Sequence, residues 1–257
     1  MSDRRTGHND GRDSEAASRA STSPKRRRIA VALLWSIAAA LMAAGFLGLD
    51  RWFYEQVALR FSTPNPVDRD PYAATALLWD SARYVGSMTG ALIAYFVVLA
   101  IHPKGWRAAN TVMVAILVAD ALGLLVKDSV CRVRPNQAPS HLTFMKPFEA
   151  LRLDTRHVAA RLRALLAGGT PPKDLSPAAV CFPSGEATAA FALATVLSLL
   201  YPRAAPFAYA AAVLAALARI LAGAHYISDV TAGAVIGTFT AAGVFRFLQK
   251  RRWRLFL

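Results

Sequence analysis

Cysteine, histidine and acidic residues are all scarce in this chain of 257 residues, and charged residues of both signs make up only 18% of it. Two cysteines exclude a small scaffold held together by many disulfides. A hydrophobic content of 55% excludes a disordered chain. The net charge is +14, but long apolar runs separate the basic residues, unlike in a soluble nucleic-acid-binding protein. We therefore expect no nucleic-acid partner.

The histidines are too few and too scattered to predict a metal site. All five stand far apart, at positions 8, 102, 141, 157 and 225, and no ligand spacing such as His-Glu-x-x-His occurs. We therefore expect neither a metal ion nor another cofactor.

Long uncharged runs are what the chain has in abundance. The first, 29–49, contains no charged residue, and as a helix it would be about 31 Å long, enough to cross the hydrocarbon core of a bilayer. It exceeds the apolar core of a signal peptide, which disfavours that alternative. Five further runs cover 84–101, 108–126, 187–202, 204–218 and 230–245, and the last three need an extra turn or two from their flanks. The sequence therefore predicts an all-α membrane protein with six transmembrane helices.

Basic residues predict how these helices are oriented. They cluster at 25–28, before the first run, and at 250–254, after the sixth, which favours the cytoplasm for both termini. We expect residues 1–28 to be a disordered tail, 29–249 the membrane domain and 250–257 a basic cytoplasmic end.

The longest connection, about 127–183, then lies on the outer side. Within it, 148–166 places apolar residues among arginines, which is typical of a short amphipathic helix on a membrane surface or of a solvated helix packed on the rest of the loop. Cys131 and Cys181 lie in the same connection. A disulfide between them is geometrically possible, and the alternative is two small buried thiols.

Ionisable residues gather where four of the predicted helices end on that outer side. Such residues are costly at membrane depth and usually line a cavity or pair with one another. The set comprises Lys127, Arg134, Glu186, Arg219, His225 and Asp229. We therefore predict a polar site at the outer boundary of the membrane.

The residue types in this set favour phosphate chemistry. Three of them are cations, and the Ser184-Gly185 pair begins a predicted helix whose free amides suit an anion. His225 stands four residues before Asp229, so the carboxylate can hold one ring nitrogen and leave the other as a nucleophile.

Three motifs in this region carry a family resemblance. The segment from Lys127 to Arg134-Pro135 matches Lys-x6-Arg-Pro, residues 183–186 nearly match Pro-Ser-Gly-His, and residues 218–229 nearly match Ser-Arg-x5-His-x3-Asp. Together they resemble the signatures of the type 2 phosphatidic acid phosphatase superfamily, over a core from about 84 to 245.

The resemblance implies a six-helix membrane phosphatase whose active site opens at the outer leaflet. By the family's pattern, His225 attacks phosphorus to give a phosphohistidine and Asp229 orients it. The phosphoryl oxygens are bound, again by that pattern, by Lys127, Arg134, Ser184, Gly185 and Arg219. No metal is expected, and water hydrolyses the intermediate.

Two positions depart from the family's pattern. Ala218 replaces a serine, which removes one supporting hydrogen bond. Glu186 replaces the histidine that protonates the leaving group. Three interpretations stay open: Glu186 is itself the acid, the substrate has a good leaving group, or catalysis is lost and the site only binds a phospholipid.

The expected substrate is a phosphate monoester or pyrophosphate of an envelope lipid. The candidates are lipid A, undecaprenyl pyrophosphate and phosphatidylglycerol phosphate, handled at a bacterial inner membrane with the site facing the periplasm. A lipid phosphotransferase that uses the same histidine, and a non-catalytic lipid-binding or transport protein, are the alternatives.

Overall fold

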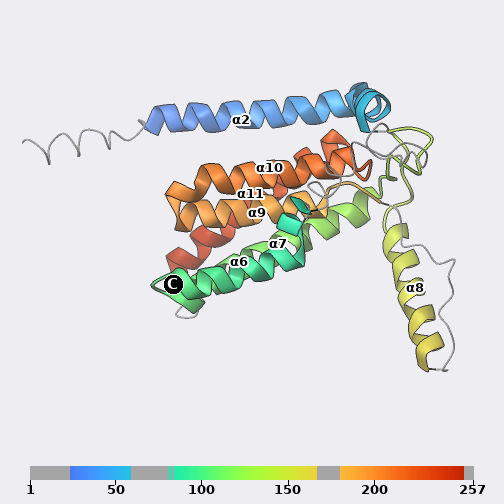
Figure 1. Ribbon diagram of the computed structural model, residues 1–257. Helices are drawn as coiled ribbons and strands as arrows, with labels where there is room; N and C mark the ends of the chain where they lie inside the picture. Colours follow the sequence, from blue (N-terminus) through green and yellow to red (C-terminus); the bar gives the residue numbers. More distant parts are fainter. Residues whose placement is uncertain (1–23, 59–80, 83, 167–179, 252–257) are drawn as a thin grey trace, which may run out of the picture. The chain divides into compact units, whose positions relative to one another are not determined.

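The computed structural model describes residues 24–58, 81–82, 84–166 and 180–251, and the chain forms two compact units, Met1–Ala39 and Ala40–Leu257. The described part is helical (Figure 1), and it holds two isolated β-bridges but no named strand. The prediction of an all-α protein is confirmed for these residues.

The helical elements of the described residues are given in chain order. They are α2 (Pro24–Ala44), η1 (Gly45–Leu49), α3 (Asp50–Phe53), η2 (Tyr54–Ala58), η3 (Tyr84–Gly86), α6 (Met88–Ile101), α7 (Gly105–Val130), α8 (Glu149–Leu166), α9 (Gly185–Leu200), η4 (Pro202–Ala204), α10 (Ala205–Leu221) and α11 (Ile227–Arg251). Every predicted apolar run coincides with one of these helices or with a consecutive series of them.

Four stretches are long and apolar enough to cross a membrane: Val31–Val57, Gly105–Val130, Pro202–Leu221 and Ile227–Lys250. The chain is therefore a helical, multi-pass membrane protein. The other two predicted crossings correspond to α6 and α9, which are shorter apolar helices. The count of six crossings stays a prediction.

The predicted ends of the membrane domain differ from the helix ends. Helix α2 begins at Pro24, so the basic residues at 25–28 are helical. The remainder of the predicted tail, 1–23, lies outside the described residues. At the other end, α11 continues to Arg251, and 252–257 lie outside the described residues.

Within the second unit, α9 packs against α7, α10 and α11 (Figure 1). Small residues make these approaches close. A Cβ atom added at Gly237 of α11 would lie 2.2 Å from the carbonyl oxygen of Thr188 in α9, so only glycine fits there. The main core cluster continues through α6 and α7, where its members include Val98, Val112 and Ile116. Close packing fixes the ends of α7, α9, α10 and α11 relative to one another.

Local sequence signals set the helix ends that matter for the site. Ser184 is the N-cap of α9, and its hydroxyl oxygen accepts a hydrogen bond from the Ala187 amide at 3.4 Å. Cys131 ends α7 in a left-handed conformation with φ of 48°. The chain then turns back, because Arg132 bridges to Phe144 and Val133 to Val180.

The predicted amphipathic helix over 148–166 is present as α8. Near its start, Ala150 is buried in a small cluster with Cys131 and Val180. Val158 and Leu166, by contrast, are exposed. Whether α8 lies on a membrane surface stays a prediction.

Candidate functional site

His225 and Asp229 form the centre of the site, at the turn from α10 into α11. Gly223, with φ of 64°, lets the chain reverse after α10, and His225 then precedes the first turn of α11. Nδ1 of His225 lies 3.7 Å from Oδ2 of Asp229, and both side chains are buried. The same Oδ2 accepts a hydrogen bond from the Tyr226 amide at 2.9 Å. Nδ1 therefore faces the carboxylate of Asp229, which leaves Nε2 as the ring nitrogen that can act as a nucleophile.

The surroundings keep the His225 ring neutral. Burial lowers the pKa of His225 from 6.5 to about 4, and the positive charges of Arg219 and Lys127 act in the same direction against Asp229. A neutral imidazole has a free lone pair at physiological pH, as a nucleophile requires.

Arg219 and Glu186 form an ion pair beside His225. Nε of Arg219, in the last turn of α10, lies 2.7 Å from Oε2 of Glu186, in the first turn of α9. The Glu186 side chain is 32% exposed and that of Arg219 is 11% exposed. The pair thus stands at the edge of the site, between the buried histidine and the exterior.

Lys127 and Arg134 contribute the other predicted cations. Lys127, in the last turn of α7, interacts electrostatically with Asp229 and with Arg134. Nε of Arg134 is buried and has no hydrogen-bond partner among the residues that the structure describes. A buried guanidinium nitrogen without a partner is suited to an anionic ligand.

The Ser184-Gly185 pair at the start of α9 contacts Asp229. The Ser184 amide donates a hydrogen bond to the Asp229 carbonyl oxygen at 3.0 Å, which joins α9 to α11. The Ser184 hydroxyl is fully buried and caps its own helix, so it presents the first amides of α9 and does not itself face outward. A Cβ atom added at Gly185 would meet nothing within 4 Å. The start of α9 therefore borders open space.

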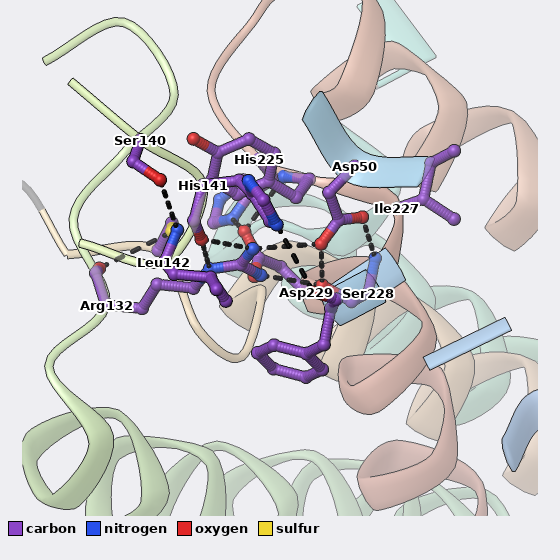
Figure 2. A network of polar contacts seen from close by, with 12 residues as sticks. Asp50, Arg132, Ser140, His141, Leu142, His225, Ile227, Ser228 and Asp229 are labelled. Atoms are coloured by element: carbon purple, nitrogen blue, oxygen red, sulfur yellow. Dashed lines mark hydrogen bonds and ion pairs between the residues drawn. The ribbon is translucent and has the colours of Figure 1, made fainter. Parts of the chain in front are cut away.

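The structure also contains a buried network that the sequence analysis missed (Figure 2). The fully buried Arg132 donates from Nη1 to Oδ1 of Asp229 and from Nη2 to Oδ2 of Asp50, both at 2.9 Å. Asp50 in turn accepts hydrogen bonds from the amide of Ser228, at 3.0 Å, and from its hydroxyl. Asp229, whose carboxylate faces His225, is therefore linked through Arg132 to Asp50, which follows the first uncharged run.

Other groups complete the surroundings of Arg132. The His141 carbonyl oxygen accepts from Nε at 2.8 Å and from Nη2 at 2.6 Å. The rings of Phe46 and Tyr226 lie 4.8 and 4.2 Å from the guanidinium carbon. His141, which the sequence marks only as a residue of the outer loop, is thus part of this arrangement. Two sequence signals point to the network: an acid at the end of an uncharged run, and an extra arginine inside the first motif.

The two cysteines are buried and free. The Cys181 thiol faces the carbonyl oxygens of Arg132 and Val133, and the Cys131 thiol faces that of Asp128. Burial raises the pKa of the Cys181 thiol. Of the two predicted alternatives, the structure has the buried thiols.

Among the described residues, no group of three or more His, Cys, Asp or Glu side chains is placed to hold a metal ion. The described residues instead include a neutral imidazole, a held carboxylate, a partly exposed acid and three cations. Such a site can bind an oxyanion and attack it.

The chain matches one protein family and resembles solved structures. The family model described as the PAP2 superfamily matches residues 106–253, more than half of the chain. The chain is similar to the crystal structure of a transmembrane PAP2-type phosphatidylglycerolphosphate phosphatase from Bacillus subtilis, with 18% identity, a TM-score of 0.52, and coverage of 85% of this chain and 96% of that one. It is also similar to LpxE from Aquifex aeolicus, with 22% identity, a TM-score of 0.47, and coverage of 74% and 94%. No curated protein sequence matches. The first likeness shows a shared fold.

Proposed function

The chain belongs to the PAP2 superfamily, and from this premise we propose that it is an integral membrane phosphatase that removes phosphate from an envelope lipid through a phosphohistidine intermediate. The observation that carries the proposal is the buried His225–Asp229 pair, which has the charges of Arg219 and Lys127 beside it.

Binding is the first step of the proposed reaction. Lys127, Arg134 and Arg219 hold the phosphoryl oxygens, together with the first amides of α9 at Gly185. The open space at Gly185 and the unpartnered Nε of Arg134 support this assignment. Ser184 contributes by capping α9 and thereby orienting these amides.

Nucleophilic attack follows. Nδ1 faces Asp229, so Nε2 of His225 attacks phosphorus, and the bond between phosphorus and the lipid oxygen breaks. Asp229 stabilises the positive charge that the ring gains. The leaving oxygen takes a proton from Glu186. In the second half, Glu186 takes a proton from water, whose oxygen attacks phosphorus and breaks the bond to His225. Inorganic phosphate leaves, and His225 and Glu186 return to their starting states.

The ion pair with Arg219 supports the acid role of Glu186. A phosphoryl group that binds Arg219 competes with the Glu186 carboxylate for the same guanidinium, 2.7 Å away. Once displaced, that carboxyl group is released from the ion pair and can take up from water the proton that it later donates. Binding of the substrate therefore prepares the proton donor.

The proposal includes the membrane arrangement. We place the six-helix domain, 29–249, in a bacterial inner membrane with both termini in the cytoplasm and the site facing the periplasm. Helices α6 and α9 complete the six crossings. Helix α9 has most of its residues buried among its neighbours, so it needs less lipid-facing apolar length than an isolated span.

Purified protein and a panel of lipids test the proposal. Lipid A, undecaprenyl pyrophosphate and phosphatidylglycerol phosphate are incubated with the protein in detergent, and inorganic phosphate is measured. The similar Bacillus subtilis protein is named for the last of these. We expect wild type and His102→Ala to release phosphate from at least one lipid and His225→Ala to release none. His102 caps the far end of α6, which makes it a matched control for loss of a histidine.

The alternatives give different outcomes in the same assay. A phosphotransferase moves a ³²P label to a second lipid and not to water. A non-catalytic binding protein leaves every lipid intact, while His225→Ala binds lipid as well as wild type does. Either result would overturn the hydrolase assignment.

A further inference from the structure

Arg132 holds two carboxylates that come from distant parts of the chain. Asp229 belongs to the first turn of α11, whereas Asp50 begins α3, directly after the first uncharged run. The side chains of all three residues are 0% exposed. Because the guanidinium is a rigid fork, the position of one carboxylate fixes the direction available to the other.

The network brings two carboxylates to one guanidinium, and Lys127 also interacts electrostatically with Asp229. In the proposed reaction the phosphorylated ring becomes positive, and Asp229 stabilises that charge. His225 also interacts with the charge of Arg219, whose ion-pair partner is Glu186.

The backbone at Gly45 comes close to Asp50 and Ser228. A Cβ atom added at Gly45 would lie 2.8 Å from Oδ1 of Asp50 and 2.8 Å from Cβ of Ser228. Glycine at that position lets the turn of η1 come close to the start of α11. The amide and hydroxyl of Ser228 then satisfy Asp50.

We propose that Arg132 and Asp50 are positioning residues, which act through Asp229 to hold His225 and which make the segment of η1 and α3 part of the working site. This inference rests on the proposed function for its kinetic consequence. A buried ion network that serves only the fold is the competing explanation. The two explanations predict different activities for variant molecules that remain folded.

The first test is kinetic. Asp50→Asn keeps the shape of the side chain and removes its charge. The control is Glu55→Gln, which breaks the exposed Arg51–Glu55 pair only five positions further along the chain. Rates are expressed per molecule that can be phosphorylated, measured by rapid quenching with ³²P-labelled lipid. We expect kcat of Asp50→Asn to fall by about ten-fold or more with KM within about two-fold, and Glu55→Gln to stay within about two-fold in both. An unchanged kcat per phosphorylatable molecule of Asp50→Asn overturns the proposal.

The second test does not depend on catalysis. Protein labelled with ¹⁵N-histidine is titrated in detergent micelles, and His225→Ala identifies the His225 signals. Arg132→Gln removes the cation between two carboxylates, so we expect the His225 titration midpoint to rise by at least about one pH unit. Adding Asp50→Asn to Arg132→Gln removes one of those carboxylates and should lower the midpoint again. A His225 titration that is the same in wild type and Arg132→Gln overturns the proposal.

The two tests separate the two hypotheses. If wild type releases phosphate from no lipid, the proposed function fails and the order of the titration midpoints still decides the role of Arg132. If Arg132→Gln does not accumulate as folded protein, kcat of Asp50→Asn decides it.

Discussion

His225 is a neutral side chain at the centre of a group of ionised ones. Its burial and the cations Arg219 and Lys127 disfavour protonation, and Asp229 opposes them only in part. Burial is the main reason that the ring stays unprotonated, and the two cations add to it. In the proposed function the same cations also bind the phosphate.

The titration of His225 should therefore lie well below that of an ordinary histidine. The pKa falls to about 4, so the ring stays neutral from pH 8 down to about pH 5 and takes up a proton only below that. Unfolded chains take up this proton near pH 6.5, so acidification between these values favours the unfolded state, and stability is lost as the pH falls. A ¹⁵N-histidine titration measures the pKa of His225, and a midpoint near pH 6.5 would contradict the buried environment.

Glu186 offers a test of the proposed proton donor. We expect Glu186→Gln to lower kcat on a lipid monoester by about 100-fold, the range of general acid catalysis. The loss should be much smaller with p-nitrophenyl phosphate, whose leaving group needs little protonation. Measuring both substrates from pH 5 to 8 separates the acid role from damage to the site. Equal losses on the two substrates would show that Glu186 only holds Arg219.

The sequence motifs predict the residues of the candidate site but not the buried residues that contact them. The motifs pointed to Lys127, Arg219 and His225 because ionisable groups at helix ends are rare in a membrane protein. Arg132 and Asp50 could not be paired from sequence, because they stand 82 residues apart and no periodicity relates them. The role of the Ser184 hydroxyl as a helix cap needed coordinates as well.

At the scale of helices, the contact between α9 and α11 positions the two halves of the site. Glu186 lies in the first turn of α9 and Asp229 in the first turn of α11. A shift of α11 along α9 would therefore move Glu186 relative to Asp229 and its neighbour His225. The glycines of α11 permit this close contact. The apolar runs predicted both helices, whereas their mutual distance depends on which glycines face Thr188, and a sequence pattern does not show that.

Replacing one of these glycines should disturb the contact. Gly237→Ala places a methyl group 2.2 Å from the Thr188 carbonyl oxygen, and such overpacking costs roughly 1–3 kcal/mol. The Tm in detergent should fall by several degrees. Gly243→Ala is the control on the same helix, because nothing lies within 4 Å of its added Cβ, and it should leave the Tm unchanged or raise it. Equal Tm values for the two variants would contradict the close packing.

At the scale of the whole molecule, the proposed topology separates two kinds of positive charge. In that topology, basic residues at the helix ends away from the site would face the cytoplasm, where anionic lipids attract them. Lys127, Arg134 and Arg219 would face the opposite side, where the proposed substrate binds. The net charge of +14 would then combine two functions.

Labelling with a membrane-impermeant maleimide checks this topology. Arg203→Cys and Gln137→Cys each add one thiol at an exposed position, in the connection before α10 and in the loop after α7. The native Cys131 and Cys181 are buried and should not react, so wild type is the control. In spheroplasts we expect Gln137→Cys to be labelled at once and Arg203→Cys only after permeabilisation. The reverse pattern would invert the orientation.

The contact between Asp50 and Arg132 also has a consequence for synthesis of the chain. At about 5–20 residues per second, Arg132 follows its partner by roughly 4–16 s, since 82 positions separate them. Ser228, 178 positions beyond Asp50, follows by roughly 9–36 s. Asp50 therefore lacks these partners while the rest of the protein emerges from the ribosome. A chain whose translation stops before α11 lacks Ser228, so Asp50 then has no complete set of hydrogen-bond partners.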